Sequence, residues 1–174
     1  MNLTWFPPAP IEGPRGIVDL PPDDWAMEAK INGCRVLVSS AGVWTRQGTP
    51  LTKPKGAETI RQLTAAWPWD KTAMIEGEWE ASTARLWLFD LPHDPGTYDN
   101  RVGLLQSLIA AYRHPDIRPM PRTLGDFPKF YEQCRDNHYE GVVVKRRSSL
   151  YRKMSRPNCK FPDWIKRRFE WDRK

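Results

Sequence analysis

The chain has 174 residues, 40% of them hydrophobic and 28% charged, and a net charge of +6, which fits a single domain, residues 1–174, with its own core. A mean hydropathy of −0.66 and the lack of any apolar run near the roughly 18 residues that cross a bilayer exclude a membrane-spanning protein. Three widely separated cysteines and an N-terminal stretch without a basic or apolar leader exclude a disulfide framework and a secretory signal, so we expect a cytoplasmic protein.

The N-terminal half is expected to form extended chain, then strands and one helix. The first 24 residues are rich in proline and glycine, so they should wrap the surface as extended chain. Apolar residues at helical spacing predict a helix over residues 56–67. The Asn32-Gly33 pair breaks the first two predicted strands, and a turn then completes a hairpin with the third. The predicted strands of this half cover residues 26–31, 35–40, 43–48, 73–80 and 84–91.

The C-terminal half is expected to contain two further helices and two strands. Apolar periodicity predicts a helix over residues 101–113, with Asp99 or Asn100 as its N-cap. Another helix is predicted over 125–137, starting near Pro128. The overall prediction is an α+β fold of mostly antiparallel strands with flanking helices. The last two strands are expected at residues 139–147 and 162–171.

Lys30 lies in the run EAKINGCRV, residues 28–36, where an isolated lysine would ordinarily be a solvated strand residue. Other charged and aromatic residues follow it along the chain, each on or beside a predicted strand. Alternate residues of a strand point to one face, so we expect their side chains to reach one shared groove. These residues are Arg35, Arg46, Glu78, Phe89, Glu140, Lys145 and Lys166.

The segments that carry these residues resemble the motifs of the covalent nucleotidyltransferase superfamily, which includes ATP-dependent DNA ligases, RNA ligases and capping guanylyltransferases. K-I-N-G-C-R is similar to the first motif, K-x-D-G-x-R, and T-R-Q-G, E-G-E, F-D, E-G-V-V-V-K and W-I-K-R-R follow in the order of the later motifs. The resemblance extends from residue 28 to residue 168. It implies an antiparallel, ATP-grasp-like ligase adenylation domain, and we expect no OB-fold domain and no N-terminal DNA-binding domain.

The resemblance implies that Lys30 attacks the α-phosphate of ATP and forms lysyl-AMP, with pyrophosphate as the leaving group. The amine must be neutral to attack, and neighbouring cations favour the neutral form. Glu140 and Glu78 would hold Mg²⁺, and Glu140 would also set the surroundings of the lysine. Lys145 and Lys166 would stabilise the charge that develops at the α-phosphate.

The remaining implied roles concern the nucleotide. Phe89 would stack on the adenine, or would simply pack in the core. Glu28 would read the edge of the base, and Gly33 would allow close approach of the backbone. Other implied nucleotide contacts are Ile31 in the first motif, Arg35 and Glu78 at the ribose, Arg46 at phosphate or ribose, and Arg168, which stands where a second lysine is commoner.

Two features bear on the substrate. Asn32 occupies the position of an acidic residue in the first motif, as in some RNA ligases. The R-x-x-L-L pattern that begins at Arg101 is closer to DNA ligases. A DNA ligase that seals nicks with a 5′-phosphate and a 3′-hydroxyl is therefore the main hypothesis. An RNA ligase, or an inactive nucleic-acid-binding module that keeps the fold, is the alternative, and no feature favours a capping enzyme that uses GTP.

Positive charge is concentrated in residues 145–174, which contain twelve Lys and Arg against three Asp and Glu, a net charge of +9. Such a segment is either a solvated surface or a contact surface for a polyanion. We expect a monomer that binds nicked duplex DNA, with RNA as the alternative, and the small size is typical of phage proteins that act in the host cytoplasm in DNA repair or replication. The residues expected to contact nucleic acid are Arg146, Arg147, Arg152, Lys153, Arg156, Lys160 and Arg167.

Overall fold

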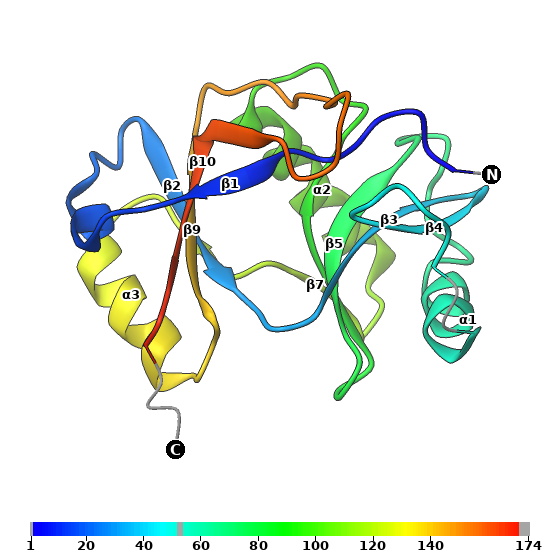
Figure 1. Ribbon diagram of the computed structural model, residues 1–174. Coiled ribbons are helices and arrows are strands. Elements are labelled where there is room, and N and C mark those ends of the chain that lie inside the picture. Colours follow the sequence, from blue (N-terminus) through cyan, green and yellow to red (C-terminus); the bar gives the residue numbers. More distant parts are fainter. Residues whose placement is uncertain (1, 52–53, 171–174) are drawn as a thin grey trace.

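The computed structural model describes residues 2–51 and 54–170, which form two five-stranded sheets side by side (Figure 1). In spatial order, the first sheet contains β1 (Ala9–Glu12), β10 (Lys160–Arg168), β9 (Gly141–Arg146), β2 (Trp25–Lys30) and β8 (Arg122–Thr123). The second sheet contains β4 (Gly42–Thr45), β3 (Cys34–Ser39), β5 (Ile75–Glu80), β6 (Arg85–Asp90) and β7 (Ile117–Pro119). The helices are η1 (Arg15–Asp19, 3-10), α1 (Pro54–Leu63), α2 (Tyr98–Tyr112) and α3 (Phe127–Asp136).

Each sheet packs one apolar face against helices. The buried cluster of the first sheet joins β2 and β9 to η1 and α3, and that of the second joins β3, β5 and β6 to α1 and α2. Figure 1 shows α3 beside the first sheet and α1 beside the second. Among the named strands only β1–β10 and β6–β7 pair in parallel, so the prediction of a mostly antiparallel α+β fold is confirmed. No helix in the described ranges is both long and apolar enough to cross a membrane.

The chain crosses from the first sheet to the second between Lys30 and Cys34. The sequence predicted a break here, but not that β2 and β3 belong to different sheets. A Cβ atom on Gly33 would lie 2.6 Å from the carbonyl oxygen of Trp79, so only glycine lets this connection pass so close to β5. Packing against the backbone of β5 is therefore one reason for glycine at this position, and the predicted close approach of the nucleotide to Gly33 stays a prediction.

The N-terminal segment differs from the surface wrap that its composition predicted. Ala9–Glu12 forms β1, which pairs in parallel with β10, and Arg15–Asp19 forms a short 3-10 helix. Further towards the N-terminus, Phe6 and Met154 exchange backbone hydrogen bonds of 2.9 and 2.8 Å. The segment therefore follows the first sheet as an additional strand.

Several element ends also differ from the predictions. Helix α2 begins after Thr97, whose side-chain oxygen accepts a hydrogen bond from the backbone of Asn100, so the predicted caps at Asp99 and Asn100 were wrong. Helix α1 ends at Leu63, although Trp67 still packs into the same cluster. The short strands β7 and β8 were missed, because three- and two-residue strands have no periodicity of their own. The last strand ends at Arg168, and residue 171 of its predicted range lies outside the described residues.

Candidate active site

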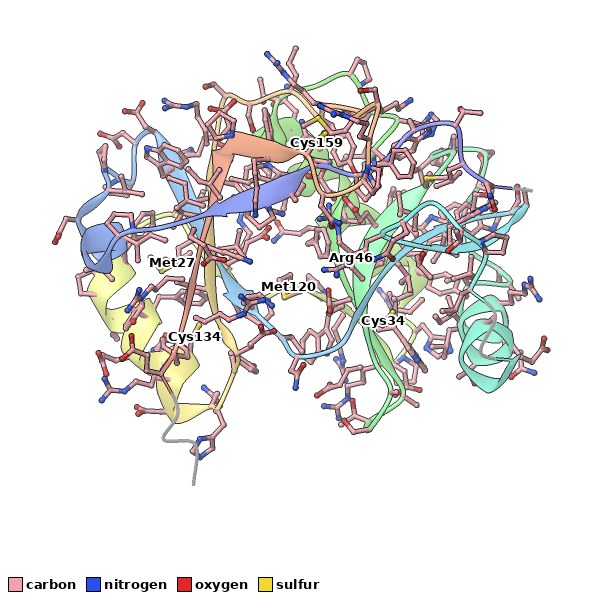
Figure 2. All side chains as sticks on the ribbon, in the orientation of Figure 1. Met27, Cys34, Arg46, Met120, Cys134 and Cys159 are labelled. Atoms are coloured by element: carbon pink, nitrogen blue, oxygen red, sulfur yellow. The ribbon has the colours of Figure 1, made fainter. Side chains whose placement is uncertain are left out.

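A cavity of about 670 Å³ opens between the facing sides of the two sheets. All the residues predicted to hold the nucleotide or perform the chemistry line it, and so does Lys160 of the predicted nucleic-acid set. Figure 2 labels three of the lining residues, Cys34, Arg46 and Met120. The predicted residues that line the cavity are Glu28, Lys30, Ile31, Arg35, Arg46, Glu78, Phe89, Glu140, Lys145, Lys166 and Arg168.

Strand alternation brings these side chains together. Met27 and Ala29 of β2 enter the core of the first sheet, whereas Glu28 and Lys30 face the cavity. The expectation of a shared groove is thus confirmed, although two facing sheets form it. The same alternation places in the cavity wall Lys145 of β9, Trp164, Lys166 and Arg168 of β10, and Glu78 of β5.

Lys30 lies at one end of the cavity in an ion pair with Glu140, their side chains being 21% and 25% exposed. The other oxygen of Glu140 accepts a hydrogen bond of 2.6 Å from Nε of Arg168. Burial raises the pKa of the Glu140 carboxyl, but the hydrogen bonds from Lys30 and Arg168 outweigh it, so its pKa lies below the ordinary value. Glu140 is therefore a charged carboxylate that fixes two cations.

Glu12 of β1 adds a second carboxylate beside these cations, although it does not line the cavity. Its Oε1 lies 2.7 Å from Nζ of Lys166 and 3.7 Å from Nη1 of Arg168. The hydrogen bond from Lys166 lowers the pKa of Glu12. Glu12 was not predicted, because only the pairing of β1 with β10 brings it opposite Lys166. We call Glu12, Lys30, Glu140, Lys166 and Arg168 the Lys30 cluster.

Glu78 has the most unusual titration among these carboxylates. Burial raises its pKa to about 7, although the nearby Lys30 and Arg35 oppose the shift. The charge of Glu140 also favours the protonated form of Glu78. Near neutral pH, Glu78 is therefore protonated in part of the molecules, where it can donate a hydrogen bond. In the rest it is ionised and adds a second negative charge beside Glu140.

This shift predicts a pH-dependent stability. Because the folded pKa exceeds the unfolded value, the contribution of Glu78 to the free energy of unfolding is complete below about pH 4.5 and is lost as the pH rises through about 7. Urea titrations over that range should show a steeper loss of stability in the wild type than in Glu78→Gln. Glu58→Gln, on exposed α1 surface, is the matched control and should follow the wild type. Parallel curves for wild type and Glu78→Gln would contradict the expectation.

Lys145 lies at the other, buried end of the cavity. Its Nζ is 2.7 Å from Oε2 of Glu28, and the two side chains are only 2% and 4% exposed. The same ammonium group lies 4.5 Å from the ring centroid of Phe89 and 4.4 Å from that of Trp164. Lys30 pairs with Gly141 and Ala26 with Lys145, so the two lysines are offset by four residues, or roughly 13 Å along the strands. Lys145 therefore lies beside Glu28 and Phe89, which were predicted to contact the base. Of the two lysines predicted to contact the α-phosphate, only Lys166 belongs to the Lys30 cluster.

Arg35 is held firmly between the two ends. Its Nε donates to Glu76 over 2.8 Å, and its Nη1 donates to the carbonyl oxygen of Pro8 over 2.7 Å. Its guanidinium carbon lies 5.6 Å from the ring centroid of Phe89. Glu76 also accepts a hydrogen bond of 2.9 Å from Tyr151, and neither of these partners was predicted. Phe89 itself is 9% exposed and belongs to the buried cluster while lining the cavity, so core packing and base stacking are compatible.

The basic residues predicted for nucleic acid fall into two groups. Arg146, Arg147 and Arg167 have acidic partners, respectively Asp163 at 2.9 Å, Asp99 at 2.7 Å and Glu170 at 3.2 Å. Arg152, Lys153, Arg156 and Lys160 are exposed, on the loop between β9 and β10 and at the start of β10. The C-terminal basic region thus includes the end of β9 and all of β10, two neighbouring strands of the first sheet.

Neither a protein-family model nor a curated protein sequence matches the chain. Solved structures do match it, and the fold is that of the nucleotidyltransferase domain of ATP-dependent DNA ligases. The ligase domain of LigD from M. tuberculosis is 22% identical, with a TM-score of 0.71, and the match covers 94% of this chain and 59% of that one. The Chlorella virus DNA ligase-adenylate is 15% identical, with a TM-score of 0.68, over 95% of this chain and 69% of that one. The ATP-dependent DNA ligase from bacteriophage T7 in complex with ATP is 14% identical, with a TM-score of 0.61, over 94% of this chain and 68% of that one.

Proposed function

We propose that the chain is an ATP-dependent polynucleotide ligase that seals nicks in duplex DNA through a lysyl-AMP intermediate. The observation that carries the proposal is the cavity, in which Lys30 contacts Glu140 within a cluster of cations and carboxylates. The fold shared with solved DNA ligases supports the proposal. A module that only binds nucleic acid would not need this cluster in a cavity between its sheets.

In the first step, the neutral amine of Lys30 attacks the α-phosphorus of ATP. A P–N bond forms, the P–O bond to pyrophosphate breaks, and the amine loses a proton. Glu140 orients Lys30 and Arg168, so releasing the lysine from this ion pair is part of activating it. Lys166 and Arg168 lie in the same cluster and would neutralise charge that develops on the phosphate.

Glu140 and Glu78, the pair expected from the sequence, are the carboxylates that would hold Mg²⁺. The described residues contain no group of three or more side chains arranged as metal ligands. This fits Mg²⁺, which commonly uses one or two carboxylates together with substrate phosphates. Bound there, the ion would neutralise part of the charge on the triphosphate.

In the later steps, AMP passes to the 5′-phosphate at a nick, and the P–N bond to Lys30 breaks. The 3′-hydroxyl then attacks that 5′-phosphate, joins the strand and releases AMP. The test is the sealing of a duplex that carries one nick, in the presence of ATP and Mg²⁺. We expect sealing of a DNA nick. Sealing of an RNA nick alone would support the alternative suggested by Asn32, which is exposed and lines the cavity, and binding without sealing of either would support an inactive module.

The exposed basic loop gives a separate prediction about DNA binding. Each phosphate contact contributes about −0.9 to the slope of log affinity against log salt, so neutralising Arg152, Lys153 and Arg156 to glutamine should flatten that slope by up to about 2.7. Formation of lysyl-AMP should persist, because these three side chains do not line the cavity. Fluorescence anisotropy with a nicked duplex over a salt series measures the slope.

The matched control neutralises three exposed basic residues elsewhere, Arg118, Lys129 and Arg135, on β7 and α3. It removes the same charge and should leave most of the slope unchanged. Equal slopes for the loop variant and the wild type would show that the loop is a solvated surface and that the duplex is bound elsewhere.

A further inference from the structure

We propose that Tyr98 is a positioning residue for nucleobase selection, because its phenol holds Glu28 as a fixed hydrogen-bond acceptor that favours a 6-amino purine over a 6-oxo purine. The inference rests on the proposed function and extends it to a residue outside the motifs. Tyr98 is the first residue of α2 and is completely buried. Its hydroxyl donates a 2.5 Å hydrogen bond to Oε1 of Glu28.

Glu28 is held from both sides. Oε1 accepts from Tyr98, and Oε2 lies 2.7 Å from the ammonium group of Lys145. Burial raises the pKa of Tyr98 well above its ordinary value, so the phenol keeps its proton and remains a donor. A carboxylate held by a cation and a donor has its orientation fixed, and each oxygen retains a further lone pair.

Tyr98 is itself fixed independently of Glu28. Its backbone N–H donates to the carbonyl oxygen of Ser149 over 2.8 Å, which ties the start of α2 to the loop after β9. The guanidinium carbon of Arg122 lies 5.3 Å from the centroid of its ring, and the ring packs with Ala26 and Val102. The helix therefore sets the position of the hydroxyl, and the hydroxyl sets the position of the carboxylate.

The chemistry of the acceptor determines which base it favours. A carboxylate accepts hydrogen bonds and donates none, so it can pair with the exocyclic amine of adenine. The 6-oxo oxygen of guanine or hypoxanthine is itself an acceptor and would face the acceptor oxygen of Glu28. A buried acceptor without a donor makes the free energy of binding less favourable. Glu28 and Phe89, the predicted stacking partner of the base, both line the cavity, and the ammonium group of Lys145 contacts both. A fixed carboxylate there discriminates more sharply than a mobile one.

Tyr98→Phe tests the proposal, because it keeps the ring and removes only the hydroxyl. We expect KM for ATP in lysine adenylylation to rise on the order of tenfold, with kcat at saturating ATP nearly unchanged, since Lys30 lies at the other end of the cavity. The preference for ATP over ITP, which differs at the 6-position, should fall by a similar factor. Equilibrium binding of ATP and ITP should show the same loss without requiring the chemical step.

Tyr112→Phe is the matched control. Its hydroxyl also donates to an oxygen, the carbonyl of Leu63, over 2.7 Å, but Tyr112 does not line the cavity. The control should lose stability to a similar extent while keeping the preference for ATP over ITP. If Tyr98→Phe also keeps that preference, Tyr98 is only a packing residue and the proposal is wrong.

Glu28→Gln provides the test if Tyr98→Phe fails to fold. An amide can turn its N–H towards a 6-oxo group, so the preference for ATP over ITP should fall, and an unchanged preference would overturn the proposal. Different results would contradict the proposed function and the role of Tyr98. A wild type that forms no adduct with any nucleotide contradicts the proposed function, whereas a wild type that forms lysyl-AMP with a selectivity independent of Tyr98 contradicts only the role of Tyr98.

Discussion

Replacing Lys30 with alanine is expected to abolish the transfer of label from ATP labelled at the α-phosphate to the protein. The amine is the proposed nucleophile, and alanine has no group that can form the phosphoramidate. Stability should change little, because Lys30 is partly exposed and its ion pair with Glu140 is also partly exposed. Labelling is read on a denaturing gel, and stability is read from thermal unfolding.

Lys71→Ala is the control for this variant. Lys71 is 66% exposed, and its partner is Asp70, at 3.5 Å on the surface. It should be labelled like the wild type. Undiminished labelling of Lys30→Ala would remove Lys30 from the mechanism, and unfolding of that variant would show that its ion pair is structural.

Replacing Arg101 with methionine is expected to lower the free energy of unfolding by about 3–5 kcal/mol, because it leaves Asp90 buried without its counter-ion. Both side chains are completely buried. Arg101 donates to the two oxygens of Asp90 over 2.6 and 3.2 Å, and to the carbonyl oxygens of Gly96 and Ser149 over 2.8 and 3.0 Å. Urea unfolding monitored by tryptophan fluorescence measures the loss.

Arg118→Met, on the exposed side of β7, is the control for Arg101→Met and should change the free energy of unfolding by no more than about 0.5 kcal/mol. A loss below about 1 kcal/mol in Arg101→Met would mean that water or rearranged neighbours satisfy Asp90. The expected large loss would explain an arginine in the R-x-x-L-L segment as an anchor between β6 and α2.

The sequence predicted the longer elements because their periodicity is local. Alternation along β2, β9 and β10 was enough to predict a shared groove, and apolar spacing was enough to find the three α-helices. The division into two sheets was not predictable in this way. It depends on pairings between distant segments, such as β2 with β9 and β1 with β10, that no local pattern encodes.

The same distinction applies to the site. The motif residues predicted to hold the nucleotide or perform the chemistry were found from their order and spacing, and the structure places them in one cavity. Their partners were missed, because three of them lie outside every motif and meet the site only through the fold: Glu12 reaches it through β1, Tyr98 through α2, and Tyr151 through the loop after β9. Lys145 shows the limit for a motif residue, since its order in the chain did not reveal that it neighbours Glu28.

The most direct test of the proposed function is detection of the covalent intermediate itself. The protein is incubated with ATP and Mg²⁺, digested, and analysed by mass spectrometry for a peptide that carries AMP. We expect one AMP per chain, located on Lys30 and removed again by added pyrophosphate. An adduct on another residue, or no adduct under conditions in which ATP binds, would contradict the proposal that this cavity forms lysyl-AMP.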